Sequence, residues 1–271
     1  DSQTYHDADY QDVHEDGYRD AQVLKALQRD LGLGDVVICR IAAEVDQQFQ
    51  AHRQDYDHAY RLDLYEDGHC NGDALQERQA KLGLGTEVVR AIAEQVAEDF
   101  DRHRQNYAQD AEDQLNQNGA LHSDRLMARQ KELGLGESIC QELEERAWNA
   151  YTQECSNFQE TIVGHLCTCG EVNETLLAGL QSKLGPSVRQ QILQVERDRF
   201  QDDIGRIAVM VGVNLHQSGD WQSGEVLQEQ QDLGLSDRVL NDVVAHVHRV
   251  RVLGQQVDLK CTAISRCFER F

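Results

Sequence analysis

Cysteine and histidine are the residues with the most obvious chemistry in this chain, which holds eight cysteines and eleven histidines among 271 residues. A structural zinc site usually needs two pairs of ligands, with the cysteines of a pair two to four residues apart. The segment His165-Leu166-Cys167-Thr168-Cys169 is the nearest approach to that spacing, and no second pair accompanies it. We therefore expect neither a bound metal nor any other cofactor.

The cysteines are interpreted as ordinary free thiols, with a regulatory disulfide between distant cysteines as the alternative. Cys167, Cys169, Cys261 and Cys267 are the candidate redox thiols. Cys261 and Cys267 are six residues apart in a predicted helix, about 240° around its axis, so they cannot bridge each other without unwinding it. The acidic segment 67–73 lacks the alternating oxygen ligands and the distal glutamate of an EF-hand, so its acids are interpreted as turn and helix-start residues.

No set of residues has the spacing of a known catalytic group. The Leu-Gly-Leu-Gly segments are not phosphate loops, because no Lys-Ser/Thr follows them and no strand is predicted before them. No candidate nucleophile has a base placed beside it. We expect the chain not to be an enzyme.

Glycines instead recur at a nearly constant interval along the chain. A turn glycine returns after 51, 51, 51 and 49 residues, and a Leu-Gly pair begins fourteen residues after each one. The first glycine of each repeat is expected to turn the chain, and the second to end a short helix in the left-handed conformation. The ten glycines are Gly17 and Gly32, Gly68 and Gly83, Gly119 and Gly134, Gly170 and Gly185, and Gly219 and Gly234.

Each repeat predicts a short helix followed by a long one. The short helix has about eleven residues and the long helix about thirty, a length of roughly 45 Å. A polar cap residue and an apolar residue before it form the expected start of the short helix, with Arg19 as an exception to the apolar pattern. The predicted caps are Asp20, Asn71, His122, Asn173 and Gln222.

These elements predict an all-α, elongated, HEAT-like array over residues 1–271. A partial repeat at 1–16 precedes the repeats 17–67, 68–118, 119–169, 170–218 and 219–271. Tyr5 lies twelve residues before a turn glycine, as Tyr56 and Tyr107 do, so residues 1–16 are predicted to end an earlier repeat of a longer protein. The fourth repeat is expected to lose two residues after Leu184-Gly185, where the only proline, Pro186, stands. Neighbouring repeats must stack to bury their apolar stripes.

The composition is strongly acidic, with 48 acidic and 26 basic residues and a formal net charge of −22. Such a charge repels nucleic acid and anionic lipid headgroups and favours a basic partner. Acidic residues that follow the long helices, such as Glu94, Glu98, Asp99 and Asp101, are either a solvated face or an acidic docking surface. No apolar segment approaches the roughly 18 residues of a membrane span.

The repeat motif resembles that of known helical modules. The residues that carry the resemblance are Gly17 to Gly34, Gly68 to Gly85, Gly119 to Gly136, and the equivalents that end at Pro186 and Ser236. They resemble the helical-repeat region of the large scaffold subunit of the chloroplast inner-envelope protein translocon. They are also similar, more distantly, to TerB-like and cyanobacterial helical repeat modules.

The translocon resemblance implies a non-enzymatic scaffold on the stromal side of the chloroplast inner envelope. Such a scaffold docks the transit peptides of preproteins and recruits stromal chaperones and other translocon subunits, and its thiols are linked to redox regulation. Transit peptides are basic and poor in acidic residues, which suits an acidic helical surface. The alternative is a TerB-like or cyanobacterial stress-response or metal-sensing module.

Overall fold

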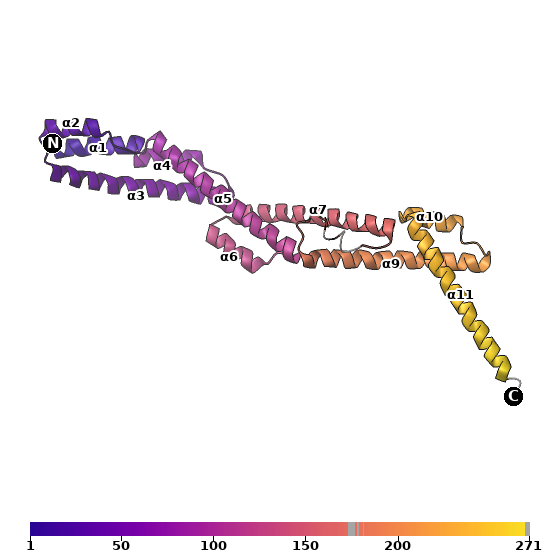
Figure 1. The fold of residues 1–271 in the computed structure, drawn as a ribbon. Helices are drawn as coiled ribbons and strands as arrows, with labels where there is room; N and C mark the ends of the chain where they lie inside the picture. Colours follow the sequence, from indigo (N-terminus) through magenta and orange to yellow (C-terminus); the bar gives the residue numbers. More distant parts are fainter. Residues whose placement is uncertain (173–176, 178, 181, 269–271) are drawn as a thin grey trace. The chain divides into compact units, whose positions relative to one another are not determined.

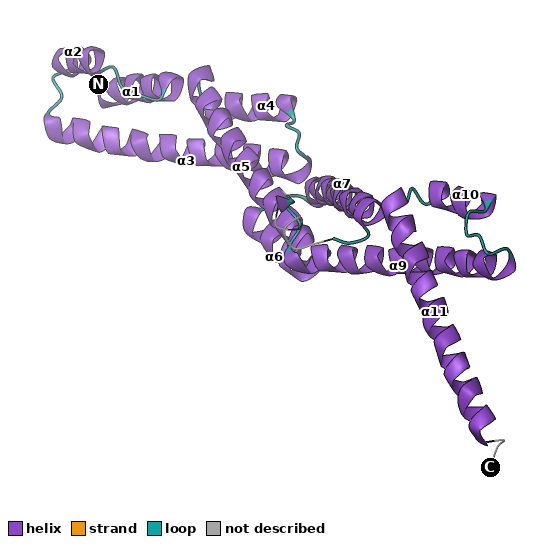
Figure 2. Ribbon diagram, turned by 45° about the vertical axis from the view of Figure 1, so that its right-hand side comes forward, coloured by secondary structure: helices purple, strands orange, loops and turns teal. Residues whose placement is uncertain are grey.

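The computed structural model describes residues 1–172, 177, 179–180 and 182–268, with side chains up to residue 252. These residues form ten helices and no strand (Figures 1 and 2), which confirms the prediction of an all-α helical-repeat fold. The long helices are α1 (Ser2–Asp16), α3 (Asp35–Asp67), α5 (Thr86–Asn118), α7 (Glu137–Cys169), α9 (Pro186–Gln217) and α11 (Asp237–Phe268). The short helices are α2 (Ala21–Leu31), α4 (Gly72–Leu82), α6 (Ser123–Leu133) and α10 (Gly224–Asp232).

The chain divides into two compact units. The N-terminal unit comprises Asp1–Gln114 and Ala120–Trp148, and the C-terminal unit comprises Leu115–Gly119 and Asn149–Phe271. The single continuous array over residues 1–271 stays a prediction. The short helix expected in the fourth repeat, with its cap at Asn173, falls largely on residues outside the described part of the chain.

Side-chain caps start most of the described short helices. Asp20 accepts hydrogen bonds from the backbone N–H groups of Gln22 and Val23, and Asn71 accepts one from Ala74. His122 stands at the start of α6 without a side-chain cap bond. The prediction of Gln222 as the cap of α10 was wrong: the cap is Ser223, whose hydroxyl accepts from the N–H of Val226. Serine is the better cap because its short side chain reaches the free N–H groups of the first turn.

Nine of the ten repeat glycines lie at positive φ, between 63° and 85°, where a side chain would strain the turn. Gly185 is the exception, and its prediction as a helix stop was wrong. It has φ −65° and ψ 160° and directly precedes α9, with Pro186 in the first turn. Proline suits that place because its fixed φ is helical and its missing N–H would have no partner there. The two missing residues therefore precede Leu184, and Leu184-Gly185 corresponds to Leu84-Gly85.

A glutamine closes each described Leu-Gly-Leu turn from inside the short helix. The side-chain amides of Gln28, Gln79, Gln130 and Gln230 donate to the carbonyl oxygens of Leu33, Leu84, Leu135 and Leu235 at 3.2, 3.0, 3.1 and 3.1 Å. These bonds hold the end of the short helix to the start of the long one.

Replacing Gln79 by methionine is expected to lower the free energy of unfolding by about 1 kcal/mol, because one carbonyl in the turn loses its partner. Gln76→Met on the exposed side of the same helix is the matched control and should change stability by less than about 0.5 kcal/mol. Urea unfolding of both variants measures the difference. Equal losses would show that the turn does not depend on the Gln79 amide.

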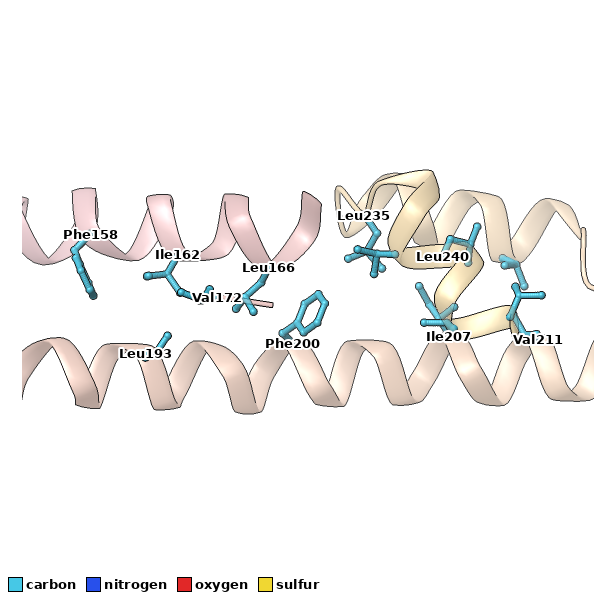
Figure 3. Packing of buried hydrophobic residues seen from close by; sticks show 14 of the residues in the cluster. Phe158, Ile162, Leu166, Val172, Leu193, Phe200, Ile207, Val211, Leu235 and Leu240 are labelled. Carbon is cyan, nitrogen blue, oxygen red and sulfur yellow. The ribbon is translucent and has the colours of Figure 1, made fainter. Parts of the chain in front are cut away.

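The core of the C-terminal unit is a layer of apolar side chains between α7, α9 and α11 (Figure 3). Ile162, Ile207 and Val211 are fully buried in it, and Phe200 points from α9 into the space between Leu166 and Leu235. The long helices thus bury one stripe each, as the spacing of three and four residues predicts.

Candidate binding surface at the helix joints

The long helices meet at four contacts that we call joints. At each joint the backbone N–H of the residue before one long helix donates to a carbonyl near the end of the long helix two repeats earlier. The donors and acceptors are Gly85 and His14 (joint 1, 2.7 Å), Gly136 and Tyr65 (joint 2, 2.7 Å), Gly185 and Asn116 (joint 3, 2.6 Å), and Ser236 and Cys167 (joint 4, 2.9 Å). Each acceptor lies three residues before a turn glycine. Joints 1 and 2 belong to the N-terminal unit, and joints 3 and 4 to the C-terminal unit.

The joints satisfy groups that helix geometry leaves without partners. The last four carbonyl oxygens of a helix have no N–H within the helix, and each joint supplies one. The negative end of one helix dipole also meets the positive end of another, which adds a favourable electrostatic contact. Each joint therefore holds a repeat in contact with the repeat two positions earlier in the chain.

Three joints bring a glycine close to another backbone, and the approach is closest at Gly85 and Gly136; a Cβ at Gly185 would lie 2.9 Å from the carbonyl oxygen of Asn116. A Cβ placed at Gly85 would overlap the carbonyl oxygen of Glu15, and one at Gly136 would overlap that of Glu66. Gly34, at the equivalent place before α3, would meet nothing within 4 Å. Joint 4 is instead built around a serine, whose Oγ donates to the carbonyl oxygen of Thr168 at 2.8 Å.

Joint 1 holds a pair of histidines on aromatic side chains. His14 is buried, and its Nδ1 lies 2.8 Å from the carbonyl oxygen of Tyr10, so Nδ1 is assigned as the protonated nitrogen. Its Nε2 lies 3.2 Å from Nδ1 of His52, and the ring stacks on Tyr10 and meets the edge of Phe49. Burial lowers the pKa of His14, and the neighbouring His52 lowers it further. His14 is thus held in its neutral form.

The stability of the N-terminal unit is expected to fall in mild acid because of His14. Its pKa in the folded chain lies below the unfolded value of about 6.5, so below that pH the unfolded chain takes up a proton more readily and the free energy of unfolding decreases. His14→Tyr copies Tyr65 of joint 2, whose hydroxyl pairs with Nδ1 of His103 at 3.1 Å. Between about pH 7.5 and about pH 5.5, the melting temperature of the variant should fall less than that of the wild type. Parallel pH profiles would contradict this role.

Joint 2 has an arginine over its aromatic ring. The Phe100 ring lies 5.1 Å from that of Tyr65, and the guanidinium carbon of Arg104 lies 5.5 Å from the centre of the Phe100 ring. The Arg104 guanidinium also lies 3.7 Å from a carboxylate oxygen of Glu142. A cation, an aromatic face and a carboxylate are therefore joined on one surface of the N-terminal unit.

Joint 4 has a hollow where joint 2 has its arginine. The hollow has a volume of about 490 Å³ and is lined by residues of α7, α9 and α11 and the turn after α7. Its apolar lining includes Phe200, Ile204, Val239 and Val243, and Asp242 stands among its polar residues. Ile204 occupies the position that corresponds to Arg104, counted from Gly185 and Gly85.

Two of the described thiols, Cys140 and Cys167, do not show the properties of reactive cysteines. Burial raises the pKa of Cys140, and burial together with the charge of Asp203 raises the pKa of Cys167. A raised pKa keeps a thiol protonated, whereas reactive cysteines are thiolates. Cys167 donates weakly to the carbonyl oxygen of Leu233 at 3.5 Å, and Cys169 is a half-buried free thiol that lines the joint 4 hollow. The side chains of Cys261 and Cys267 lie outside the described part, so a redox role of these four thiols stays a prediction.

Acidic charge is concentrated in the N-terminal unit. It holds 32 acidic and 15 basic residues, a formal charge of −17, against 16 acidic and 11 basic residues, a charge of −5, in the C-terminal unit. Eight arginines of the N-terminal unit are already engaged by carboxylates within the same unit: Arg19, Arg61, Arg78, Arg90, Arg102, Arg104, Arg129 and Arg146.

One exposed acidic stripe runs along α5. Glu94, Glu98 and Asp101 are spaced by four and three residues, so they share the face opposite the buried Ile92 and Val96. Asp99, which the sequence grouped with them, lies on another side and is bound by Arg61 at 2.7 Å and by Arg102. Asp99 is therefore part of the internal ion pairs, and the other three form the solvent-facing stripe.

Other kinds of site are not evident in the described part of the chain. Among its residues, no group of three or more histidine, cysteine, aspartate or glutamate side chains is arranged to hold a metal ion. None of the helices searched there combines the length and the apolar character that crossing a membrane requires. Comparison of the chain with protein-family models, curated proteins and solved structures finds no match.

Proposed function

We propose that this chain is a non-enzymatic helical scaffold whose acidic N-terminal unit binds basic peptide segments. The supporting observation is the formal charge of −17 in that unit, where arginines are already paired with carboxylates. The stripe of Glu94, Glu98 and Asp101 is exposed, and only Glu94 among these three is paired, with Arg90 at 3.8 Å. A surface of one sign raises the local concentration of oppositely charged ligands and speeds their association.

The specific form of the proposal is a scaffold for protein import into chloroplasts. The repeat motif resembles that of the large scaffold subunit of the inner-envelope translocon. In this proposal the chain is a soluble region on the stromal side, its ligands are transit peptides, and stromal chaperones and other translocon subunits bind the same scaffold. Transit peptides are rich in arginine and serine and poor in acidic residues, so their charge is complementary to that of the N-terminal unit.

The proposal is tested by neutralising the α5 stripe in the full chain. The variant Glu94→Gln/Glu98→Gln/Asp101→Asn should raise the Kd for a basic, acid-free peptide of about 20 residues by about threefold or more at low salt, because three nearby attractive charges are removed. The matched control, Glu160→Gln/Asp202→Asn/Glu225→Gln, removes three exposed acids of the C-terminal unit and should change the Kd less. Fluorescence anisotropy measures both. Equal effects of the two variants would contradict a binding surface on the N-terminal unit.

A further inference from the structure

The hollow at joint 4 has the composition of a site for a cation. One of its lining residues is Phe200, which is 7% exposed and rises from α9 between Leu166 and Leu235 (Figure 3). Carboxylates of Glu171 and Asp242 stand at its edge, together with one guanidinium, Arg238. The fixed charges around an apolar, ring-containing hollow therefore sum to a negative value.

Joint 2 shows which group fits such a hollow. There the guanidinium of Arg104 covers the Phe100 ring and faces Glu142. Counted from the start of each long helix, Phe100 corresponds to Phe200, and Glu142 corresponds to Asp242. The ring and the carboxylate recur at joint 4, and the arginine does not, because Ile204 replaces it.

Among the described residues no ion pair joins a cation to this carboxylate, although Arg238 lies four residues before it and lines the same hollow. The ion pairs within the C-terminal unit join Arg199 to Glu196 and Arg206 to Asp203 and Glu229. None of them includes Asp242. The ring and carboxylate of joint 4 are thus present in the same register as at joint 2, beside an open volume of about 490 Å³.

We propose that joint 4 binds an arginine side chain of a basic partner peptide, in the place that Arg104 fills at joint 2. The inference rests on the proposed function, and it adds a defined arginine site to the general attraction by the acidic unit. A guanidinium can lie flat on the Phe200 ring and pair with Asp242 through two N–H groups, which a lysine ammonium cannot do. Arginine is therefore preferred over lysine at this site.

The test uses the full chain, an arginine-containing basic peptide, and the same peptide with citrulline, a neutral analogue, at each arginine. Cys169 lines the hollow, and Cys39 is an exposed thiol of the N-terminal unit. The rate at which iodoacetamide alkylates each thiol is measured by mass spectrometry. The arginine peptide should slow alkylation of Cys169 and leave Cys39 unchanged, and the citrulline peptide should protect neither.

Two variants make the result specific to the joint. Ile204→Arg fills the hollow with the chain's own guanidinium and should abolish the protection of Cys169 by peptide. Asp242→Asn keeps the shape of the exposed side chain and should weaken the protection about fivefold. A thermal melt followed by circular dichroism checks that both variants fold, and Asp242→Asn remains informative if Ile204→Arg does not.

The proposal is overturned if folded Asp242→Asn protects Cys169 as the wild type does, or if the citrulline peptide protects it equally. Failure of the proposed function looks different. In that case neutralising Glu94, Glu98 and Asp101 would leave the affinity for peptide unchanged, whatever happens to Cys169. The two results therefore separate the arginine site from the acidic surface.

Discussion

Gly85→Ala is expected to lower the free energy of unfolding by about 3 kcal/mol, at the upper end of the usual cost of an overpacked contact. The added Cβ would overlap the carbonyl oxygen of Glu15, a backbone atom that cannot rotate away as a side chain can. Separating the two backbones would also lengthen the 2.7 Å bond from the Gly85 N–H to His14. Gly136→Ala should behave in the same way, since its Cβ would overlap the carbonyl oxygen of Glu66.

Gly34→Ala is the matched control for both variants. Gly34 precedes α3 as Gly85 precedes α5, but no atom lies within 4 Å of its added Cβ. The small cost of alanine at a helix cap is common to all three variants, so the difference between them reports the joint. Urea unfolding should place Gly85→Ala at least about 2 kcal/mol below Gly34→Ala. Equal stabilities would show that the joint opens without cost.

Arg19→Ala is expected to cost about 3–5 kcal/mol, the usual result of removing one partner from a buried ion pair. Arg19 donates to both carboxylate oxygens of Asp9, at 2.6 and 3.3 Å, and to the carbonyl oxygen of Ala42 at 3.0 Å. Asp9 is completely buried, so without Arg19 its carboxylate has lost the charge that compensates it. Denaturant unfolding measures the loss.

Two further variants test the explanation. Asp9→Ala/Arg19→Leu copies Ala111 and Leu121, which stand at the equivalent positions before and after Gly119, and should recover most of the lost stability because no charge remains buried. Arg146→Ala removes an exposed arginine that lies 3.7 Å from Glu142 and should cost less than about 1 kcal/mol. A double variant no more stable than Arg19→Ala would exclude the unpaired carboxylate as the cause.

Arg19 also shows what a repeat pattern can and cannot predict. The sequence marked it as the exception among residues that are otherwise apolar before the short helix. The structure supplies the reason, because Arg19 contacts the residue eight positions before the turn glycine. That residue is Asp9 here, whereas the equivalent residues of later repeats are Tyr60, Ala111, Ile162 and Val211. Around Gly68 the two equivalent positions hold Tyr60 and Cys70, and the thiol of Cys70 interacts with the hydroxyl of Tyr60. The two positions change together, so comparing repeats in pairs could have found this contact.

The helices were predictable because their signals are local. Glycine turns, short polar caps and apolar spacing of three and four residues depend on neighbours within one repeat. The cap at Ser223 was missed because caps were counted three residues from the turn glycine, and Ser223 stands four residues after Gly219. The role of Gly185 was missed because the two-residue loss was placed after Leu184 instead of before it. Structure corrects this because Gly185 donates to Asn116 as Gly85 donates to His14.

The joints could not be predicted from one repeat. They bring together residues about 70 positions apart, and the contact is between backbone groups, which leave little trace in side-chain types. One signal was available: Gly85, Gly136 and Gly185 precede long helices without a positive φ, so their own conformation does not demand glycine. Glycine without a positive φ points to a close approach of another backbone.

The central claim is that the acidic N-terminal unit binds basic peptides, and the salt dependence of binding tests it most directly. The measurement is the Kd of the full chain for an arginine-rich, acid-free peptide at about 50 mM and about 200 mM salt, across which surface charges become increasingly screened. We expect binding at low salt and a Kd at least about tenfold higher at high salt. Absence of binding at low salt, or a Kd that does not change with salt, would contradict the claim.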